Sequence, residues 1–396
     1  MLTRQGAIAT AASVTLVVVG RLFAIFELFL VGAGGAALVI GAVVSTGLTR
    51  LRLDVARDLR PPRIHAGNAS TVTLVVSNGG RRCTPVLQLR DAVGPGRTAS
   101  VVLSPLSPGE RVTAVYTLPG EHRGVVGVGP LEVRVCDPFG LAALSVPAAP
   151  VVELTVWPLV ERVMAPAPAP GCDDDIGTRS GLSPSGDEFF ALRPYADGDD
   201  LRRVHWRASA KRDDLVVRQD ERPGQGRVVI VLDTRPGSYT SDTFERAVSA
   251  AASIAVAAAR QGHVLRLVTT AGHDSGSSTS GAGTEHIEAM LDQLAVVQTR
   301  EAGHLATVVA TMERTGHRTG GRVVVVTGEE DPGRGERMRT PGAGPNTTVV
   351  VFASDDAPTR PPLGNGSVIV VERSTSFARA WNQAAAASSS FVAVSP

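Results

Sequence analysis

The sequence predicts an α+β multidomain protein: an N-terminal hairpin of two transmembrane helices, a β-sandwich, and a doubly wound α/β domain. Three observations support this. Residues 5–20 and 28–49 carry no charge. Residues 51–160 form short alternating runs punctuated by Gly and Pro, which is typical of antiparallel strands. From residue 227 onward, continuous apolar runs alternate with helical patterns, which is typical of a parallel sheet covered by helices.

The predicted hairpin occupies residues 1–49. A spanning helix needs about 20 apolar residues. Residues 28–49 satisfy this alone, and the first segment does so if it includes residues 22–26 while Arg21 snorkels to the interface. The alternative is a cleaved signal peptide followed by one anchor, but no convincing A-x-A cleavage site precedes Leu22.

Basic residues flank the hairpin unevenly. One arginine precedes the first helix and five follow the second, whereas the turn carries one Arg and one Glu; the flanking residues are Arg4, Arg50, Arg52, Arg57, Arg60 and Arg63. The positive-inside rule then predicts a multi-pass plasma-membrane protein with its soluble domains in the cytoplasm. The signal-peptide alternative would place them outside.

The first soluble region, residues 50–160, is predicted to be a β-sandwich with an immunoglobulin-like layout. Residues 137–140, Asp-Pro-Phe-Gly, have the composition of a tight turn. A sandwich of this size is more often a spacer or docking module than a catalyst. Residues 161–185 are predicted to be a Pro/Ser/Gly/Asp-rich linker. Its acidic run, residues 173–175, resembles a solvated loop more than a calcium loop, because calcium ligands are spaced two apart.

Composition excludes several classes of function. Lys211 is the only lysine and has no glycine-rich lead, so the chain has no Walker A nucleotide-binding loop. The net charge of +1 predicts no nucleic-acid partner. The three cysteines form no CxxC pair, and no HExxH or GxSxG motif is present. The abundance of Arg, Ala, Gly and Val is typical of a GC-rich, actinobacterial-like genome.

The second soluble region, residues 223–396, is predicted to be the doubly wound α/β domain. Its strands are expected at residues 227–233, 263–270, 322–327, 347–353 and 367–372. Its helices are expected at residues 242–260, 285–296, 303–315 and 376–388. Asp242 and Glu245 suggest a capping box for the first helix, and Gly262 suggests its end.

Residues 186–222, between the two regions, combine aromatic, acidic and basic side chains. Nine acids nearly balance eight bases, which indicates an internal ion-pair network and not a phosphate-binding stripe. We interpret this segment as wrapping onto the following domain. An alternative is a hydrolase in which His205 is the base, Ser209 the nucleophile and Asp199 the orienting carboxylate. Hydrolase triads usually draw residues from separate parts of a fold, so we favour the structural interpretation and expect no enzyme.

The segment also resembles the signature of the bacterial domain of unknown function 58 family. The resemblance is carried by Gly186, Glu188, Phe189, Leu192, Arg193, Tyr195, Gly198, Asp199, Arg202, His205, Trp206, Ser209, Ala210 and Leu215. Residues 124–141, a Gly-rich strand ending in Asp-Pro-Phe-Gly-Leu, resemble the same family. The residues we expect to form the signature or interaction surface are Arg193, Tyr195, Gly198, Asp199, Arg202, His205, Trp206, Arg207 and Ser209.

The resemblance implies that the C-terminal domain is von Willebrand factor A-like. Such domains often hold Mg²⁺ through Asp-x-Ser-x-Ser after the first strand, with a Thr and an Asp from later loops. Here Asp233 matches the first ligand and Ser238 lies next to the last, but Arg235 replaces a serine and Gly328 stands where an Asp would be expected. An arginine at a ligand position opposes a cation, so we expect a degenerate site and no required cofactor.

The resemblance further implies a membrane-anchored cytoplasmic adaptor or scaffold. Its partners would be a MoxR-type AAA+ ATPase and a transglutaminase-like membrane protein, acting in assembly or remodelling of envelope or secreted complexes. The alternatives are the hydrolase and a divalent-cation-dependent adhesion module at Asp233.

Overall fold

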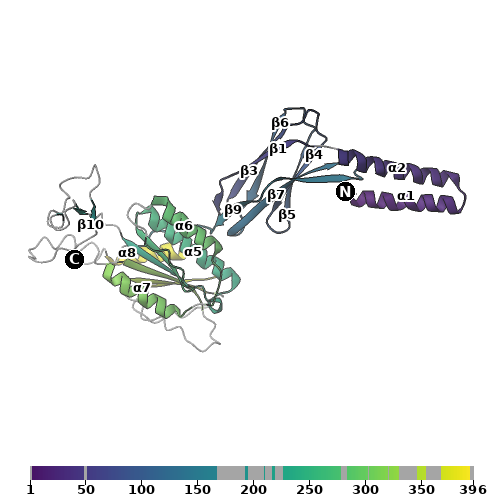
Figure 1. The fold of residues 1–396 in the computed structure, drawn as a ribbon. Coiled ribbons are helices and arrows are strands. Elements are labelled where there is room, and N and C mark those ends of the chain that lie inside the picture. The colour runs from purple at the N-terminus through teal and green to yellow at the C-terminus, as the bar shows by residue number, and fades with distance from the viewer. Residues whose placement is uncertain are drawn as a thin grey trace, which may run out of the picture. The chain divides into compact units, whose positions relative to one another are not determined.

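The computed structural model describes residues 2–48, 51–166, 192–194, 209, 216–218, 226–277, 283–301, 303–319, 321–329, 346–353 and 367–392 (Figure 1). The chain divides into two compact units, residues 1–157 and 158–396. The first unit holds two apolar helices and two β-sheets, and the second holds a parallel α/β domain.

The two N-terminal helices, α1 (Arg4–Leu22) and α2 (Phe26–Leu48), are long and apolar enough to cross a membrane, in agreement with the predicted spans. They lie side by side as a hairpin (Figure 1). Six buried positions repeat at seven-residue intervals, with small residues on α1; these positions are Gly6, Ser13 and Gly20 on α1 and Gly32, Val39 and Thr46 on α2, where Ala42 is also buried.

Close approach of the two backbones explains the small residues. A Cβ on Gly32 would lie 2.7 Å from the Val17 nitrogen, and one on Gly20 would lie 2.5 Å from the Phe29 nitrogen. Packing of this kind holds helices together in lipid, where the hydrophobic effect between helices is absent. Large apolar side chains such as Leu22 and Phe26 are exposed on the outside of the hairpin. The helices are therefore consistent with membrane association.

The β-region consists of two sheets packed around one core, as the alternating pattern predicted. The first sheet has the order β1-β3-β6, and the second β2-β9-β7-β4-β5 with β8 also pairing with β7. The core is aliphatic and includes Leu74, Leu89, Leu131 and Leu154. The strands are β1 (Leu53–Arg60), β2 (Arg63–His65), β3 (Ala69–Asn78), β4 (Leu87–Val93), β5 (Arg97–Leu103), β6 (Arg111–Pro119), β7 (Gly124–Cys136), β8 (Ala143–Ala149) and β9 (Val152–Trp157).

A buried polar cluster crosses this core. Arg57 on β1 forms an ion pair of 2.7 Å with Asp91 on β4, and the Tyr116 hydroxyl on β6 donates to the other Asp91 oxygen at 2.6 Å. The Arg57 side chain is only 2% exposed, and it also donates to the Pro150 carbonyl. Although Arg57 was counted among the basic residues flanking the membrane, it is an internal residue of the sandwich and contributes no surface charge there.

The turn at residues 137–142 joins the sandwich to the hairpin. The Asp137 carboxylate accepts from the Phe139 and Ala142 nitrogens, and the Gly140 nitrogen donates to the Asp137 carbonyl at 3.0 Å. Thr3, the N-cap of α1, donates its nitrogen to the Leu141 carbonyl at 2.9 Å and its hydroxyl to the Gly140 carbonyl at 2.6 Å. The predicted turn is confirmed, and it also holds the first turn of a helix.

The second unit is built on a five-stranded parallel sheet, as predicted. The order β13-β12-β14-β15-β16 places the second strand outside the first and the remaining strands on the other side. The order in which the chain adds strands therefore reverses between β12 and β14, although the two strands are parallel. This position is a topological switch point. The strands are β12 (Arg227–Leu232), β13 (Val264–Thr269), β14 (Gly321–Gly328), β15 (Thr347–Phe352) and β16 (Ser367–Val371).

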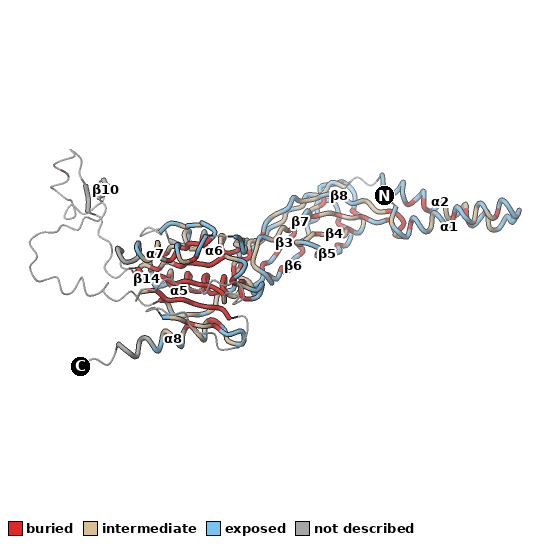
Figure 2. The backbone as a smooth tube through the Cα atoms, turned by 90° about the horizontal axis from the view of Figure 1, so that it is seen from below, coloured by how far each residue is buried: buried red, intermediate tan, exposed pale blue. Residues whose placement is uncertain are grey.

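Helices cover both faces of this sheet. Alternation along β14 sends Val323 and Val325 into a cluster with Val309 and Met312 of α7. On the other face the sheet packs against α5, with α8 beside it, and α6 packs against α5. Figure 2 shows the strands and α5 as largely buried. The helices are α5 (Ser241–Arg260), α6 (Gly283–Val296), α7 (Leu305–Thr319) and α8 (Phe377–Val392).

The predicted capping box on α5 was wrong. Thr240 is the N-cap, and it exchanges hydrogen bonds with Thr243, not Asp242 with Glu245. The helix begins at Ser241, so Asp242 lies inside the first turn, where its charge favours the helix dipole. Thr243 is buried at the third position, and its hydroxyl can bond back to the cap.

Residues 158–166, which we call the strap, lie along α5 and α8. Ser249 on α5 donates to the Leu159 carbonyl at 2.6 Å, and Ser253 accepts from the Glu161 nitrogen at 2.9 Å. On α8 the Trp381 indole donates to the Met164 carbonyl at 2.8 Å. The first residues of the predicted linker are thus docked on the α/β domain; the remainder, 167–185, lies outside the described residues.

Candidate functional site

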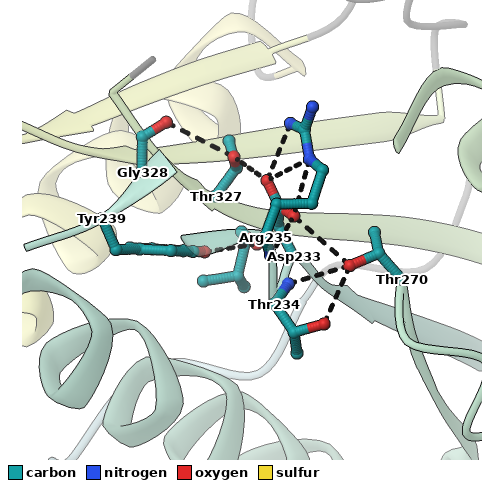
Figure 3. A network of polar contacts seen from close by, with 8 residues as sticks. Asp233, Thr234, Arg235, Tyr239, Thr270, Thr327 and Gly328 are labelled. Atoms are coloured by element: carbon teal, nitrogen blue, oxygen red, sulfur yellow. Dashed lines mark hydrogen bonds and ion pairs between the residues drawn. The ribbon is translucent and has the colours of Figure 1, made fainter. Parts of the chain in front are cut away.

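The candidate site lies at the carboxyl ends of β12, β13 and β14, beside the switch point. Asp233 follows β12, Thr270 follows β13, and Thr327 is near the end of β14. Parallel strands place their carboxyl ends at one edge of the sheet, so each strand delivers one polar side chain to the same place. Figure 3 shows these side chains converging on the Asp233 carboxylate.

Asp233 is 0% exposed and its carboxylate is fully engaged by the protein itself. The Arg235 nitrogen and Nε each donate to Oδ1 at 3.0 Å, and Arg235 Nη2 donates to Oδ2 at 2.9 Å. Thr327 donates to Oδ2 at 2.9 Å and Thr270 to Oδ1 at 3.3 Å. This forked ion pair fixes the guanidinium as well as neutralising the carboxylate.

Two threonines extend the network toward β13. The Thr234 nitrogen donates to the Thr270 hydroxyl at 2.9 Å, and the two hydroxyls lie 3.0 Å apart. The Thr270 nitrogen donates to the Leu232 carbonyl at 3.1 Å, which ties the loop after β13 to the end of β12. The network is buried at Thr234 and Thr270, so its geometry is determined by packing as well as by hydrogen bonding.

Tyr239 closes the other side of the cluster. Its hydroxyl donates to the Val326 carbonyl at 3.2 Å. Burial, followed by the negative charge of Asp233, raises the pKa of Tyr239 well above its ordinary value. The phenol therefore stays protonated and acts as a hydrogen-bond donor.

Gly328 is required by close approach. A Cβ at this position would overlap the Ser238 carbonyl oxygen and lie 2.7 Å from the Tyr239 ring. Ser238 belongs to the short 3-10 helix Pro236–Ser238 and is itself buried. The position where a third acidic ligand was expected is thus filled by the packing of Ser238 and Tyr239 on β14.

These residues do not fit a Mg²⁺ site. The guanidinium of Arg235 occupies both oxygens of Asp233, and Gly328 brings no oxygen ligand on a side chain. Magnesium requires near-octahedral oxygen ligands, and a fixed cation at the carboxylate repels it. Among the described residues, no group of three or more His, Cys, Asp or Glu side chains could hold a metal ion.

Most of the predicted signature residues cannot be placed. Arg193 lies on β10 (Leu192–Pro194), which pairs antiparallel with β11 (Val216–Arg218), opposite Val217. Ser209, the predicted alternative nucleophile, is buried. The remaining residues lie outside the described ones: Tyr195, Gly198, Asp199, Arg202, His205, Trp206 and Arg207.

Sequence reasoning identified Asp233 and the conflict with Arg235, but it missed Thr270, Thr327 and Tyr239. A signal was available for the two threonines. Each ends a buried apolar run, and polar residues at the ends of parallel strands meet at one edge. Tyr239 reaches the cluster from the loop before α5, and no periodicity marks such a residue.

Part of the chain matches a protein-family model. Residues 191–376 match the family model described as "Protein of unknown function DUF58". Residues 191–376 of this chain belong to the DUF58 family. The match includes the segment from residue 191 through the α/β domain and ends near the start of α8, so the DUF58 assignment rests on the second unit. No curated protein matches the chain.

Solved structures resemble parts of this chain only weakly. The CARDB domain of PF1109 from Pyrococcus furiosus is 15% identical, with 27% of this chain and 93% of that chain covered and a TM-score of 0.21. The putative ApaA protein from Bordetella pertussis is 17% identical, with 27% and 94% covered and a TM-score of 0.19. The alkylpurine DNA glycosylase AlkC from Pseudomonas fluorescens is 11% identical, with 33% and 39% covered and a TM-score of 0.20.

Proposed function

We propose that this DUF58 protein is a membrane-anchored cytoplasmic adaptor that works with a MoxR-type AAA+ ATPase. The supporting observation is the state of Asp233, which already accepts hydrogen bonds from Arg235, Thr270 and Thr327. A carboxylate so engaged offers no lone pair to a substrate proton or a cation. The cluster at the switch point is rigid and reaches the surface through Arg235, which suits the holding of a partner better than catalysis.

The fold details of the adaptor are part of the proposal. The parallel sheet with an aspartate after β12 suits a von Willebrand factor A-like domain, whose strand-end edge would hold the protein partner. The two-sheet region suits an immunoglobulin-like spacer between this domain and the membrane. The process we propose is assembly or remodelling of envelope or secreted complexes, with a transglutaminase-like membrane protein as a second partner.

Orientation in the membrane follows from charge. Arg4, Arg52, Arg60 and Arg63 are exposed residues flanking the hairpin, even though Arg57 is internal. Thr3 bonds to Leu141 of the sandwich, so the start of α1 lies beside the soluble part. Under the positive-inside rule, this arrangement supports a cytoplasmic soluble part.

Two native cysteines test the orientation. Cys83 and Cys136 are exposed, free thiols of the sandwich. In a Cys172→Ser background, a membrane-impermeant maleimide should label them only after cells are permeabilised. A Cys83→Ser, Cys136→Ser variant gives the background signal. Equal labelling in intact cells would show that the soluble part lies outside and would exclude a cytoplasmic ATPase as partner.

The partner is tested by affinity purification of the full-length chain from its native membrane, with and without ATP, followed by mass spectrometry. We expect a AAA+ ATPase whose recovery depends on nucleotide. Arg207→Ala, in the signature segment, should reduce that recovery, whereas Arg97→Ala, in an exposed ion pair of the sandwich, should not. Recovery of no ATPase under any nucleotide condition would contradict the adaptor proposal.

A further inference from the structure

One end of the β-sandwich meets the start of α1 and the end of α2, and we call this end the rim. It consists of Leu2, Arg4, Arg52, residues 79–82 and residues 137–142. Its parts are fixed to each other: Thr3 bonds to Leu141, and the Gly79 nitrogen donates to the Arg52 carbonyl at 2.8 Å. The rim and the helix ends also share a small buried cluster of Val39, Ala42, Leu141 and Ala142.

Phe139 stands out at the rim. Its side chain is 66% exposed, although its backbone is held by the Asp137 carboxylate. The next residue, Gly140, has a φ of +69°, and a Cβ there would lie 3.1 Å from the Gln5 Oε1 of α1. Phe139 therefore lies level with the first turn of α1. A large aromatic ring on a rigid turn at that level is placed where aromatic side chains favour the membrane–water interface.

The rim is also basic. Arg4, Arg52, Arg81 and Arg82 are exposed. The loop that carries Arg81 and Arg82 is ordered by the buried Asn78 amide, which accepts from the Gly80 nitrogen and donates to the Arg82 carbonyl at 2.8 Å.

Three carboxylates lie at the same end and reduce this charge without cancelling it. Asp137 is buried in the turn, Glu110 accepts from the Ser107 nitrogen at 2.7 Å, and Asp54 lies beside Gly79. Four guanidinium groups remain against these three acids. Arginines next to a membrane surface are attracted by anionic lipids.

We propose that the rim binds an anionic lipid surface. Phe139 enters the boundary between headgroups and acyl chains, and the four arginines bind lipid phosphates. The proposal rests on the membrane anchoring in the proposed function and adds a second contact, made by the sandwich itself. Because Asp137 preorganises the turn, the backbone that carries the ring is ordered before it meets lipid and loses little conformational entropy on contact.

Depth-dependent fluorescence quenching tests the aromatic contact. The full-length Phe139→Trp variant is placed in nanodiscs of phosphatidylcholine and phosphatidylglycerol, with or without bromine on the acyl chains, and the parent's emission is subtracted. We expect brominated lipid to quench the added emission. Val125→Trp is the matched control, because Val125 is exposed on β7 roughly 35 Å along the strand from the rim. Its emission should be unchanged.

A third reporter separates this proposal from the anchoring itself. Leu30→Trp, at an exposed position inside α2, should be quenched if the hairpin lies in the bilayer. Quenching of Leu30→Trp without quenching of Phe139→Trp overturns the rim proposal and leaves the anchoring intact. Absence of quenching at both positions overturns both.

The charge requirement is tested in the same nanodiscs. Replacing phosphatidylglycerol by phosphatidylcholine should reduce the quenching of Phe139→Trp, and so should added salt. The further changes Arg81→Gln and Arg82→Gln should remove the difference between the two lipids, while Arg60→Gln and Arg97→Gln, at the opposite end of the sandwich, should preserve it. Quenching that is identical in neutral and anionic lipid would refute the role of the arginines.

Discussion

The two units contain the same trio of residue types, a buried Asp paired with an Arg and accompanied by a partly buried Tyr, and they use it differently. In the sandwich, Arg57 is 2% exposed and lies between two sheets. In the α/β domain, Arg235 is 23% exposed at the edge of a sheet. The first ion pair is structural, because both of its side chains are buried between the sheets. The second reaches the surface through its arginine, so it sets the charge of the edge that we propose meets a partner.

The largest expected effect is in the sandwich. Asp91→Ala leaves the Arg57 guanidinium buried without its carboxylate, which should lower the free energy of unfolding by about 3–5 kcal/mol. Urea unfolding of the detergent-solubilised chain, followed by near-UV circular dichroism, measures it. Glu121→Ala, which breaks an exposed ion pair with Arg97, is the control and should cost less than about 1 kcal/mol. Equal effects of the two changes would refute the structural role of the cluster.

The next effect concerns the glycine beside each cluster. Gly328→Ala forces a Cβ into Ser238 and should cost about 1–3 kcal/mol by overpacking. Gly129→Ala, beside Arg57, should also destabilise, because its φ is +112° and a Cβ would lie 2.9 Å from the guanidinium. Gly34→Ala, on α2 with open space around the Cβ, is a control that should be neutral. Thermal unfolding compares the three, and a neutral Gly328→Ala would show that the site relaxes.

A third experiment asks whether Arg235 takes the place of a cation. Arg235→Ser leaves Asp233 buried and charged, which should cost about 1–3 kcal/mol. Millimolar Mg²⁺ should raise the unfolding temperature of this variant and leave that of the parent unchanged, since a ligand that binds only the folded state stabilises it. Stabilisation of the parent by Mg²⁺ would show that the native residues around Asp233 do bind the cation, and it would support the adhesion alternative.

The smallest effect is a shared pH dependence. Burial is the main cause that raises the pKa of Tyr116 and of Tyr239 above the ordinary 10.0, with Asp91 and Asp233 adding to it. Because the folded state favours the protonated phenols, their contribution is complete below about pH 10 and declines above it, as the unfolded chain ionises. The urea midpoint of the parent should therefore be lower at about pH 11 than at about pH 9. The difference between the two midpoints should be smaller for Tyr116→Phe. An equal fall in both would exclude Tyr116 as a contributor.

The sequence predicted the five parallel strands well, because continuous valine runs such as residues 323–326 report burial on both faces of a sheet. It also predicted the two sheets of the first unit and the turn at Asp137. Those features depend on local periodicity and turn chemistry, which can be read without knowing the fold.

The remaining features depend on contacts between distant residues. Arg57 looked like a surface flank because nothing near it in the sequence marks Asp91 or Tyr116 as partners. Thr243 and not Glu245 completes the cap of α5, since the N-cap lies two residues earlier than the pattern indicated. Asp233 was identified, but the converging threonines were not, because the loops that carry them are brought together only by the sheet.

The strap has a mechanical consequence. A pulling force that reaches the second unit from Trp157 meets the hydrogen bonds of Leu159 and Glu161 to α5 before it can reach the parallel sheet. The bonds of Met164 to α8 take the load next. We therefore expect α5 and α8 to carry tension from the strap before the sheet does. The polar cluster around Asp233 should then keep its geometry while the strap is pulled.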